Sequence, residues 1–245
     1  DLASGKLLAD IVALLSKHGV RYRVLYQDDY LYPKYMERFF SRYSALVSVW
    51  EAGCMLNSAT ERTKKINVLY GAGKYLTLVR PTRGIYDLVL SFGEPDAALA
   101  GLISRTQVVG NPKFDDWFNG TVDEAQVRGI REKCDPHKKT LLYLPTHSDL
   151  SSVDMLADQL VDLSNRFNVI VKAHYYLTHE EPDRVAKLTR GNVLMYDDAS
   201  DLLPLLKVAD VVLSDNSSAI FDAMLAGLRS RQIPKAFAAY RGDCG

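Results

Sequence analysis

The chain has 245 residues, of which 47% are hydrophobic, which is enough for one large or two modest domains with real cores. Basic and acidic residues are equal in number, 30 each, so no global field recruits nucleic acid or an anionic membrane. Three cysteines without ligand spacing indicate neither a disulfide framework nor a zinc site, and no apolar run reaches the ~18 residues of a membrane span. These features predict a cytoplasmic protein whose membrane contact is at most peripheral.

The first half of the chain alternates between helix and strand patterns. Leucines and an isoleucine recur at helical spacing in residues 3–17, and His18-Gly19 ends that pattern. The other predicted elements are strands at 20–26, 45–50, 65–70, 86–92 and 107–109 and helices at 32–43 and 95–103. This rhythm is typical of a parallel sheet of Rossmann type. Such a domain normally opens with a strand, and this chain opens with a helix and no initiator Met, so we expect a fragment or a missing amino-terminal segment.

A polar, charge-rich segment at 120–139, with a predicted helix at 122–133, reads as a hinge, and the alternation restarts beyond it. The further predicted elements are strands at 140–144, 169–173, 193–196 and 211–213 and helices at 152–167, 183–189, 202–208 and 220–228. The sequence thus predicts an α/β protein of two Rossmann-like domains. We place the two domains at 1–119 and 120–245, with a small ligand in a cleft between them.

The turn Ser214-Asp215-Asn216-Ser217-Ser218 joins a strand pattern to a helix pattern. In a parallel sheet, such a turn lies at the carboxyl edge, where ligands bind. Free amides at the start of the helix, its positive dipole end and two serine hydroxyls favour a phosphate or diphosphate there. Ser and Asp are also ordinary helix caps, so the turn alone leaves that second interpretation open.

Two other strand ends bring polar groups to the same edge. Thr146 and His147 follow the strand at 140–144, while Lys172 and His174 end the next strand. Such a set of donors with one cation suits a nucleotide diphosphate, although each residue alone is also compatible with an ordinary surface position. His174 and His179 lie five residues apart without an acidic third ligand, so no metal site is expected.

In the first half, Tyr70-Gly71-Ala72-Gly73-Lys74 follows a strand pattern. Its glycines allow a ligand to approach the backbone closely. Their spacing fits neither Walker A nor GxGxxG, so a plain turn explains this segment equally well.

Taken in order, these motifs resemble the CDP-glycerol glycerophosphotransferase family, which builds teichoic acids and related polymers on the two-domain GT-B fold. LLYLPTHSD (141–149) resembles the family's Pro-Thr-Phe-Arg-Asp motif, VKAH (171–174) its Lys-x-His, and ADVVLSDNSSAIFDAML (209–225) its Ser-Ser segment with Phe-Asp shortly after. VVGNPKFD (108–115) is similar to the motif that closes the first domain, and GAGK (71–74) to a His-Gly-centred motif. The resemblance covers roughly residues 65 to 235.

The resemblance implies that Ser217 and Ser218 hold the donor diphosphate, and that His174 stabilises charge on the donor phosphate as the nucleotide leaves. The candidate donor-binding residues are Thr146, His147, Lys172, Asp215, Ser217, Ser218 and Asp222, and the candidate acceptor-side residues are Gly71, Gly73 and Lys74. No cofactor is implied, since the nucleotide is a substrate.

Three departures from the family pattern concern the chemistry. The family's general-base histidine falls at Tyr70, and a tyrosine titrating near 10 is a poor base at neutral pH. The motif's Phe-Arg is replaced by His147-Ser148, which removes a cation that could bind phosphate. The segment after Leu228 offers only a short strand near Gln232-Ile233 and a Tyr-Arg-Gly at 240–242, so truncation is also expected there.

The sequence therefore predicts a transferase that moves a glycerol-phosphate, polyol-phosphate or sugar unit from a nucleotide-diphosphate donor to a hydroxyl acceptor in cell-surface polymer synthesis. The acceptor can be lipid-linked, which would place the protein at the inner face of the cell membrane. A UDP-sugar 2-epimerase or an ordinary GT-B glycosyltransferase is one alternative. A non-catalytic nucleotide-sugar-binding protein is another, and Tyr70 is the catalytic candidate that favours it.

Overall fold

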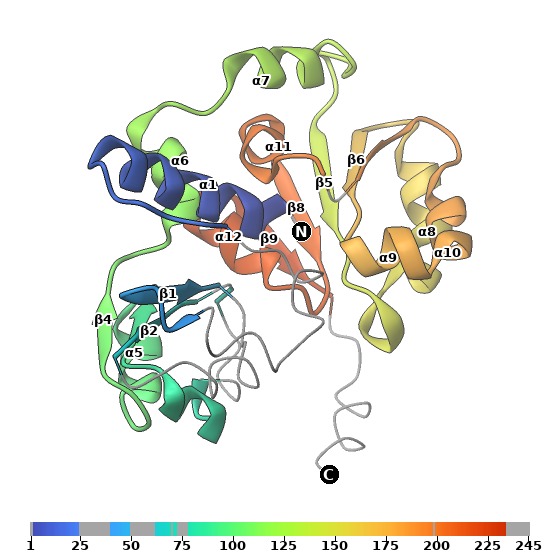
Figure 1. Ribbon diagram of the computed structural model, residues 1–245. Helices are drawn as coiled ribbons and strands as arrows, with labels where there is room; N and C mark the ends of the chain where they lie inside the picture. Colours follow the sequence, from blue (N-terminus) through green and yellow to red (C-terminus); the bar gives the residue numbers. More distant parts are fainter. Residues whose placement is uncertain are drawn as a thin grey trace. The chain divides into compact units, whose positions relative to one another are not determined.

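The computed structural model describes residues 2–24, 40–49, 62–69, 71–72, 78–197 and 199–233, and Figure 1 shows their course. The chain forms two compact units. We call residues 4–113 the amino-terminal unit, and residues 1–3 with 114–245 the carboxyl-terminal unit. The sequence had suggested a boundary after residue 119; the units divide at Lys113 and Phe114. Each unit is an α/β structure with its own parallel sheet.

The amino-terminal unit contains a four-stranded parallel sheet in the order β1-β2-β3-β4. Its elements are α1 (Leu2–Lys17), β1 (Ala45–Ser48), β2 (Lys64–Val68), the 3-10 helix η2 (Pro81–Ile85), β3 (Leu88–Ser91), α5 (Glu94–Ala100) and β4 (Thr106–Val108). Four predicted strands and two predicted helices are thereby confirmed. The helix expected at 32–43 lies almost wholly outside the described residues.

The strand predicted at 20–26 is wrong as far as the structure describes it, because residues 20–24 form no strand. The backbone N–H of Val20 donates to the carbonyl of Leu15, so the chain is still leaving α1 at that point. Val20 and Tyr22 are 49% and 44% exposed. An alternating pattern such as Val-Arg-Tyr-Arg-Val becomes a strand only when a neighbouring strand and a buried face support it, and the described part of the chain provides neither here.

The carboxyl-terminal unit contains five parallel strands in the order β7-β6-β5-β8-β9. Its strands are β5 (Thr140–Leu144), β6 (Asn168–Lys172), β7 (Val193–Tyr196), β8 (Val211–Ser214) and β9 (Arg229–Gln232), which confirms the five predicted in this half. Starting from β5, the chain adds β6 and then β7 on one side of the sheet, and afterwards β8 and then β9 on the other side. This is the doubly wound arrangement, with its topological switch point between β5 and β8.

Helices cover both faces of this sheet (Figure 1). The helices of this unit are α6 (Asp115–Asn119), α7 (Glu124–Arg131), α8 (Val153–Leu163), α9 (Tyr175–Glu180), α10 (Pro182–Leu188), α11 (Leu202–Val208) and α12 (Ala219–Leu225). Of the 3-10 helices, η4 (Ser148–Leu150) lies between β5 and α8, and η3 (Pro112–Phe114) stands at the boundary of the two units. Successive side chains of a strand point to opposite faces. Leu142 accordingly packs with residues of α7, α11 and α12, whereas Tyr143 packs with residues of α8, α9 and α10.

Two short helices, α6 and α9, were not expected from the sequence, because five or six residues are too few to show a helical period. The helix predicted at 220–228 ends sooner, at Leu225, since Gly227 adopts φ 75° and turns the chain toward β9. Within the described residues, no helix is long and apolar enough to cross a membrane.

Candidate functional site

The candidate site lies in the carboxyl-terminal unit, where β5 and β8 are neighbours and the chain leaves them in opposite directions. Residues 145–152 leave the end of β5 toward α8, and residues 215–218 leave the end of β8 toward α12. Ligands of doubly wound sheets bind at this point, outside the carboxyl ends of the strands. Thr146, His147, Asp215, Ser217 and Ser218 all fall on these two loops, as the sequence predicted.

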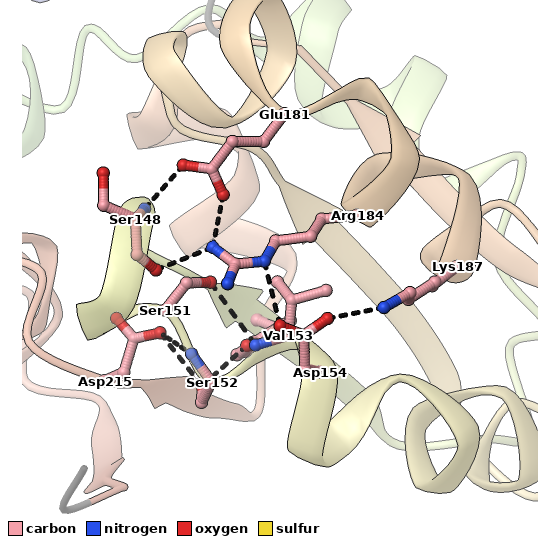
Figure 2. Close-up of polar contacts among 10 residues, drawn as sticks. Ser148, Ser151, Ser152, Val153, Asp154, Glu181, Arg184, Lys187 and Asp215 are labelled. Atoms are coloured by element: carbon pink, nitrogen blue, oxygen red, sulfur yellow. Dashed lines mark hydrogen bonds and ion pairs between the residues drawn. The ribbon is translucent and has the colours of Figure 1, made fainter. Parts of the chain in front are cut away.

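Asp215 joins the two loops from inside the protein. Its side chain is 0% exposed, and its Oδ1 accepts a hydrogen bond of 2.8 Å from the backbone N–H of Thr146. Its Oδ2 accepts from both the backbone N–H and the hydroxyl of Ser152, each at 2.9 Å (Figure 2). A carboxylate that accepts three such bonds is well compensated for its burial. What the structure shows for Asp215 is therefore a loop-holding role; direct donor binding by Asp215 stays a prediction.

The hydrogen-bond network continues into the core. The hydroxyl groups of Ser152 and Tyr143 lie 2.7 Å apart, and burial raises the pKa of Tyr143 well above its usual value, so the phenol stays protonated. Ser214, the last residue of β8, donates its hydroxyl to the carbonyl of Leu144, the last residue of β5, at 2.7 Å. The ends of both strands are thus fixed to each other before either loop begins.

Ser217 and Ser218 stand at the start of α12, and both are half-buried. The hydroxyl of Ser217 accepts from the backbone N–H of Ala219 at 3.3 Å, so this residue caps the helix in part. Ser218 occupies the N-cap position without a side-chain capping bond. The capping interpretation of the turn is thus confirmed for Ser217, and phosphate binding by the two serines stays a prediction.

His147 and His174 lie side by side, although 27 residues separate them in the sequence. Their ring centroids are 4.6 Å apart, and the ring of Tyr176 lies 4.8 Å from His147 and 5.8 Å from His174. The backbone N–H of Tyr176 donates to Nδ1 of His174 at 3.2 Å. Nδ1 is then the acceptor nitrogen, so a neutral His174 carries its proton on Nε2 and uses that nitrogen as a donor.

The remaining candidates differ in how the structure places them. Lys172 ends β6, is half-buried and donates from Nζ to the carbonyl of Asp197 at 3.2 Å. Asp222 lies in α12 with 7% exposure. Gly71 follows β2 in the amino-terminal unit. The candidates Tyr70, Gly73 and Lys74 lie outside the described residues.

Sequence reasoning missed Ser152, Tyr176 and Glu181. Ser152 is the first residue of a predicted helix, so it could have been recognised as a cap, but its partner Asp215 lies 63 residues further along the chain. Tyr176 is visible in the sequence only as one of two adjacent tyrosines. Glu181 accepts the backbone N–H of Ser148 at 2.6 Å, and nothing in the local pattern predicts that pairing. Among the described residues, no group of three or more His, Cys, Asp or Glu side chains could hold a metal ion.

Comparison with known families identifies the chain. Residues 101–226, more than half of the sequence, match the CDP-Glycerol:Poly(glycerophosphate) glycerophosphotransferase family. The chain belongs to this family. The matched range contains the strand-end motifs at 108–115, 141–149, 171–174 and 209–225, and the glycine segment at 71–74 lies outside it.

Solved structures share the fold of this glycerophosphotransferase family member. A variant of the wall teichoic acid polymerase TagF soaked with CDPG matches with a TM-score of 0.56 and 19% identity, over 76% of this chain and 52% of that one. UDP-GlcNAc 2-epimerase from Neisseria meningitidis, bound to UDP-GlcNAc, matches with a TM-score of 0.62 and 11% identity, over 92% and 72%. Anabaena HepE in complex with UDP-glucose gives 0.52 and 12%, over 90% and 69%.

The chain spans about half the length of the TagF chains that it matches. At these identities the likeness shows the fold, which is the two-sheet α/β class of GT-B enzymes. No curated protein matches the chain.

Proposed function

We propose that the protein transfers a glycerol-phosphate, polyol-phosphate or sugar unit from a nucleotide-diphosphate donor to a hydroxyl acceptor in the synthesis of a cell-surface polymer. The observation that carries this proposal is the pair of loops at the β5–β8 switch point, held together by buried Asp215. These loops bring Thr146 and the two serines to the edge where a doubly wound sheet binds its ligand. Membership of the glycerophosphotransferase family supports the choice of donor.

The groups at this edge suit the charge of a diphosphate. Hydroxyl groups of Ser217 and Ser218 would donate to its oxygens, Lys172 would supply a positive charge, and Nε2 of His174 would donate to a phosphate oxygen. For a donor of the CDP-glycerol type, the acceptor oxygen bonds to the phosphorus of the glycerol phosphate, and the bond from that phosphorus to the nucleotide breaks. Negative charge then gathers on the departing nucleotide phosphate, where fixed donors and a cation stabilise it most.

The acceptor hydroxyl must lose its proton during this step, and the residue at position 70 is the candidate general base that accepts it. The resemblance puts the general base there, and the chain has Tyr70. A tyrosine with its usual pKa near 10 is almost fully protonated at neutral pH, so it accepts a proton poorly. We therefore expect slow transfer in the native chain. Donor binding without any transfer would instead identify a nucleotide-sugar-binding protein.

The donor is tested by calorimetric titration of the purified chain with CDP-glycerol, CDP-ribitol, UDP-N-acetylglucosamine and the free nucleotides. We expect one CDP-linked donor to bind selectively, and the double variant Ser217→Ala/Ser218→Ala to lose that binding. Ser230→Ala, in the middle of β9, is the matched control and keeps it. If none of these compounds binds to the folded chain, the proposal is wrong.

We also propose that the protein works at the cytoplasmic face of the membrane on an acceptor that can be lipid-linked. The support is the kind of polymer that the family builds. Co-sedimentation with liposomes that carry a lipid-linked polyol-phosphate acceptor is the test, with acceptor-free liposomes as the control. Equal recovery from both kinds of liposome would contradict this part of the proposal.

A further inference from the structure

The loop after β5 contains an unusual backbone conformation next to the candidate site. Ser148 has φ 57°, and among the described residues it is the one position besides glycines with a positive φ. The left-handed region is sterically unfavourable for an L-residue, so such a conformation persists only where surrounding contacts impose it. The contacts that hold Ser148 therefore indicate what the loop is built to maintain.

Two side chains from the α9–α10 region hold both backbone groups of Ser148 (Figure 2). Glu181 accepts the Ser148 N–H through Oε1 at 2.6 Å, and Arg184 donates from a terminal guanidinium nitrogen to the Ser148 carbonyl at 2.7 Å. Glu181 and Arg184 also form an ion pair with each other. The Glu181–Arg184 ion pair thus forms hydrogen bonds with the peptide groups on both sides of Ser148.

This charged pair is anchored and largely shielded. Nε of Arg184 donates to Asp154 of α8 at 2.9 Å, and Lys187 of α10 contacts the other oxygen of Asp154 at 2.6 Å. The hydrogen bond from Lys187, together with the charge of Arg184, lowers the pKa of Asp154 below its usual value. The side chains of Arg184 and Glu181 are only 23% and 18% exposed, so water screens their interaction less than that of a surface pair.

The contacts of Glu181 and Arg184 with the Ser148 backbone bear on the orientation of the His147 ring. Ser148 follows His147 directly, and its hydroxyl lies 2.9 Å from Nδ1 of that ring. The ring in turn lies against His174 and Tyr176 at the carboxyl ends of β5 and β6. If residue 148 returned to an ordinary conformation, the chain path at His147 would change and the ring would leave this contact.

We propose that Glu181 and Arg184 are positioning residues that hold Ser148 in its left-handed conformation and so fix His147 against His174. The function of this pair of histidines as part of the donor site rests on the proposed function above; the positioning itself does not. His147, which replaces the motif's phenylalanine, is already oriented before the donor binds. Orienting its ring therefore takes nothing from the free energy of donor binding.

The alternative is that Arg184 merely ties α8 to α10, and the chain offers a matched control for it. Arg190, two residues beyond the end of α10, pairs with Asp158 of α8 at 2.6 Å and donates to the carbonyl of Lys187, so its partners among the described residues lie in α8 and α10 and not in the loop. Arg184→Lys keeps the charge but loses the fork that reaches Ser148, Glu181 and Asp154 together. Arg190→Lys makes the same chemical change in a pair that serves only the helices.

The first measurement is the nuclear Overhauser effect between the rings of His147 and His174 in the nucleotide-free protein. We expect it in the native chain and in Arg190→Lys, and expect it to be lost in Arg184→Lys and in Glu181→Gln. Methyl signals from the helices report whether each variant is folded. An unchanged effect in folded Arg184→Lys, or an equal loss in Arg190→Lys, would overturn the inference.

The second measurement is donor affinity. If the competent loop falls to about a tenth of the population in Arg184→Lys, the dissociation constant of the bound donor rises about tenfold, while Arg190→Lys leaves it unchanged. Loss of the ring contact with undiminished affinity would remove the functional half of the inference. A native chain that binds no nucleotide would refute the proposed function alone, because the ring contact is still measured without a ligand.

Discussion

The role of Asp215 as the connector of the two site loops can be tested with Asp215→Asn. The amide oxygen can still accept the N–H of Thr146, but the new NH₂ group then faces the N–H and hydroxyl of Ser152. The hydroxyl can rotate to accept, whereas the N–H cannot. Ser152 is 0% exposed, so its N–H loses its partner out of reach of water, which costs about 1–3 kcal/mol. The remaining hydrogen bonds lose their charged acceptor, which adds about 1 kcal/mol to the destabilisation.

We therefore expect Asp215→Asn to lower the free energy of unfolding by about 2–4 kcal/mol, measured by urea titration followed by circular dichroism. The exposed residue Asp162 provides the control, since Asp162→Asn should change the free energy of unfolding by less than about 0.5 kcal/mol. Hydrogen exchange localises the effect: the amides of Thr146 and Ser152 should exchange faster in Asp215→Asn. A variant as stable as the native chain, with both amides still protected, would refute the connector role.

Three further predictions concern acid stability, the core and catalysis. Hydrogen bonds from Lys139 and from the Thr140 N–H lower the pKa of Asp210, so the stability that this carboxylate adds is present above about pH 5 and is lost as the pH falls below about 4. Since its side chain is 37% exposed, Asp210→Asn should lower the free energy of unfolding by no more than about 1 kcal/mol at pH 7 and should not change it at pH 2. Urea titrations at both pH values measure these losses, and equal losses would contradict the prediction. Leu142→Ala, at a position that is 0% exposed in the centre of the sheet, should cost about 2–5 kcal/mol in the same assay, and a loss under 1 kcal/mol would show a poorly packed core. Tyr70→His should raise the rate of transfer at pH 7 by about a hundredfold in a radiolabelled-donor assay, whereas an unchanged rate would mean that position 70 does not hold the base.

Much of the carboxyl-terminal unit could be predicted from the sequence because β5, β6, β7 and β8 are short, mostly apolar runs with clear ends. The predicted bounds of the strands at 140–144 and 193–196 agree with β5 and β7, and those of the helix at 202–208 agree with α11. The amino-terminal unit shows where such reading fails. Residues 20–24, Val-Arg-Tyr-Arg-Val, alternate like a strand, but no partner strand among the described residues turns that pattern into one.

The composition of the candidate site was also readable from the sequence, since polar residues that follow parallel strands must meet at one edge. Thr146 and Ser217–Ser218 do lie on the two loops of the switch point. The order of the strands, which makes β5 and β8 neighbours, depends on hydrogen bonds between segments about 70 residues apart, and no local pattern contains them.

By itself, then, the sequence determined most of the secondary structure, the family and the groups available for binding a donor, because local periodicity and motif order are properties of neighbouring residues. Tertiary structure alone decided what those groups do to each other. It made buried Asp215 the acceptor for Thr146 and Ser152, placed His147 against His174, and set Glu181 and Arg184 around Ser148. Each of these contacts joins residues far apart in the chain, and its energy comes from a burial and geometry that exist only once the sheet and its helices have assembled.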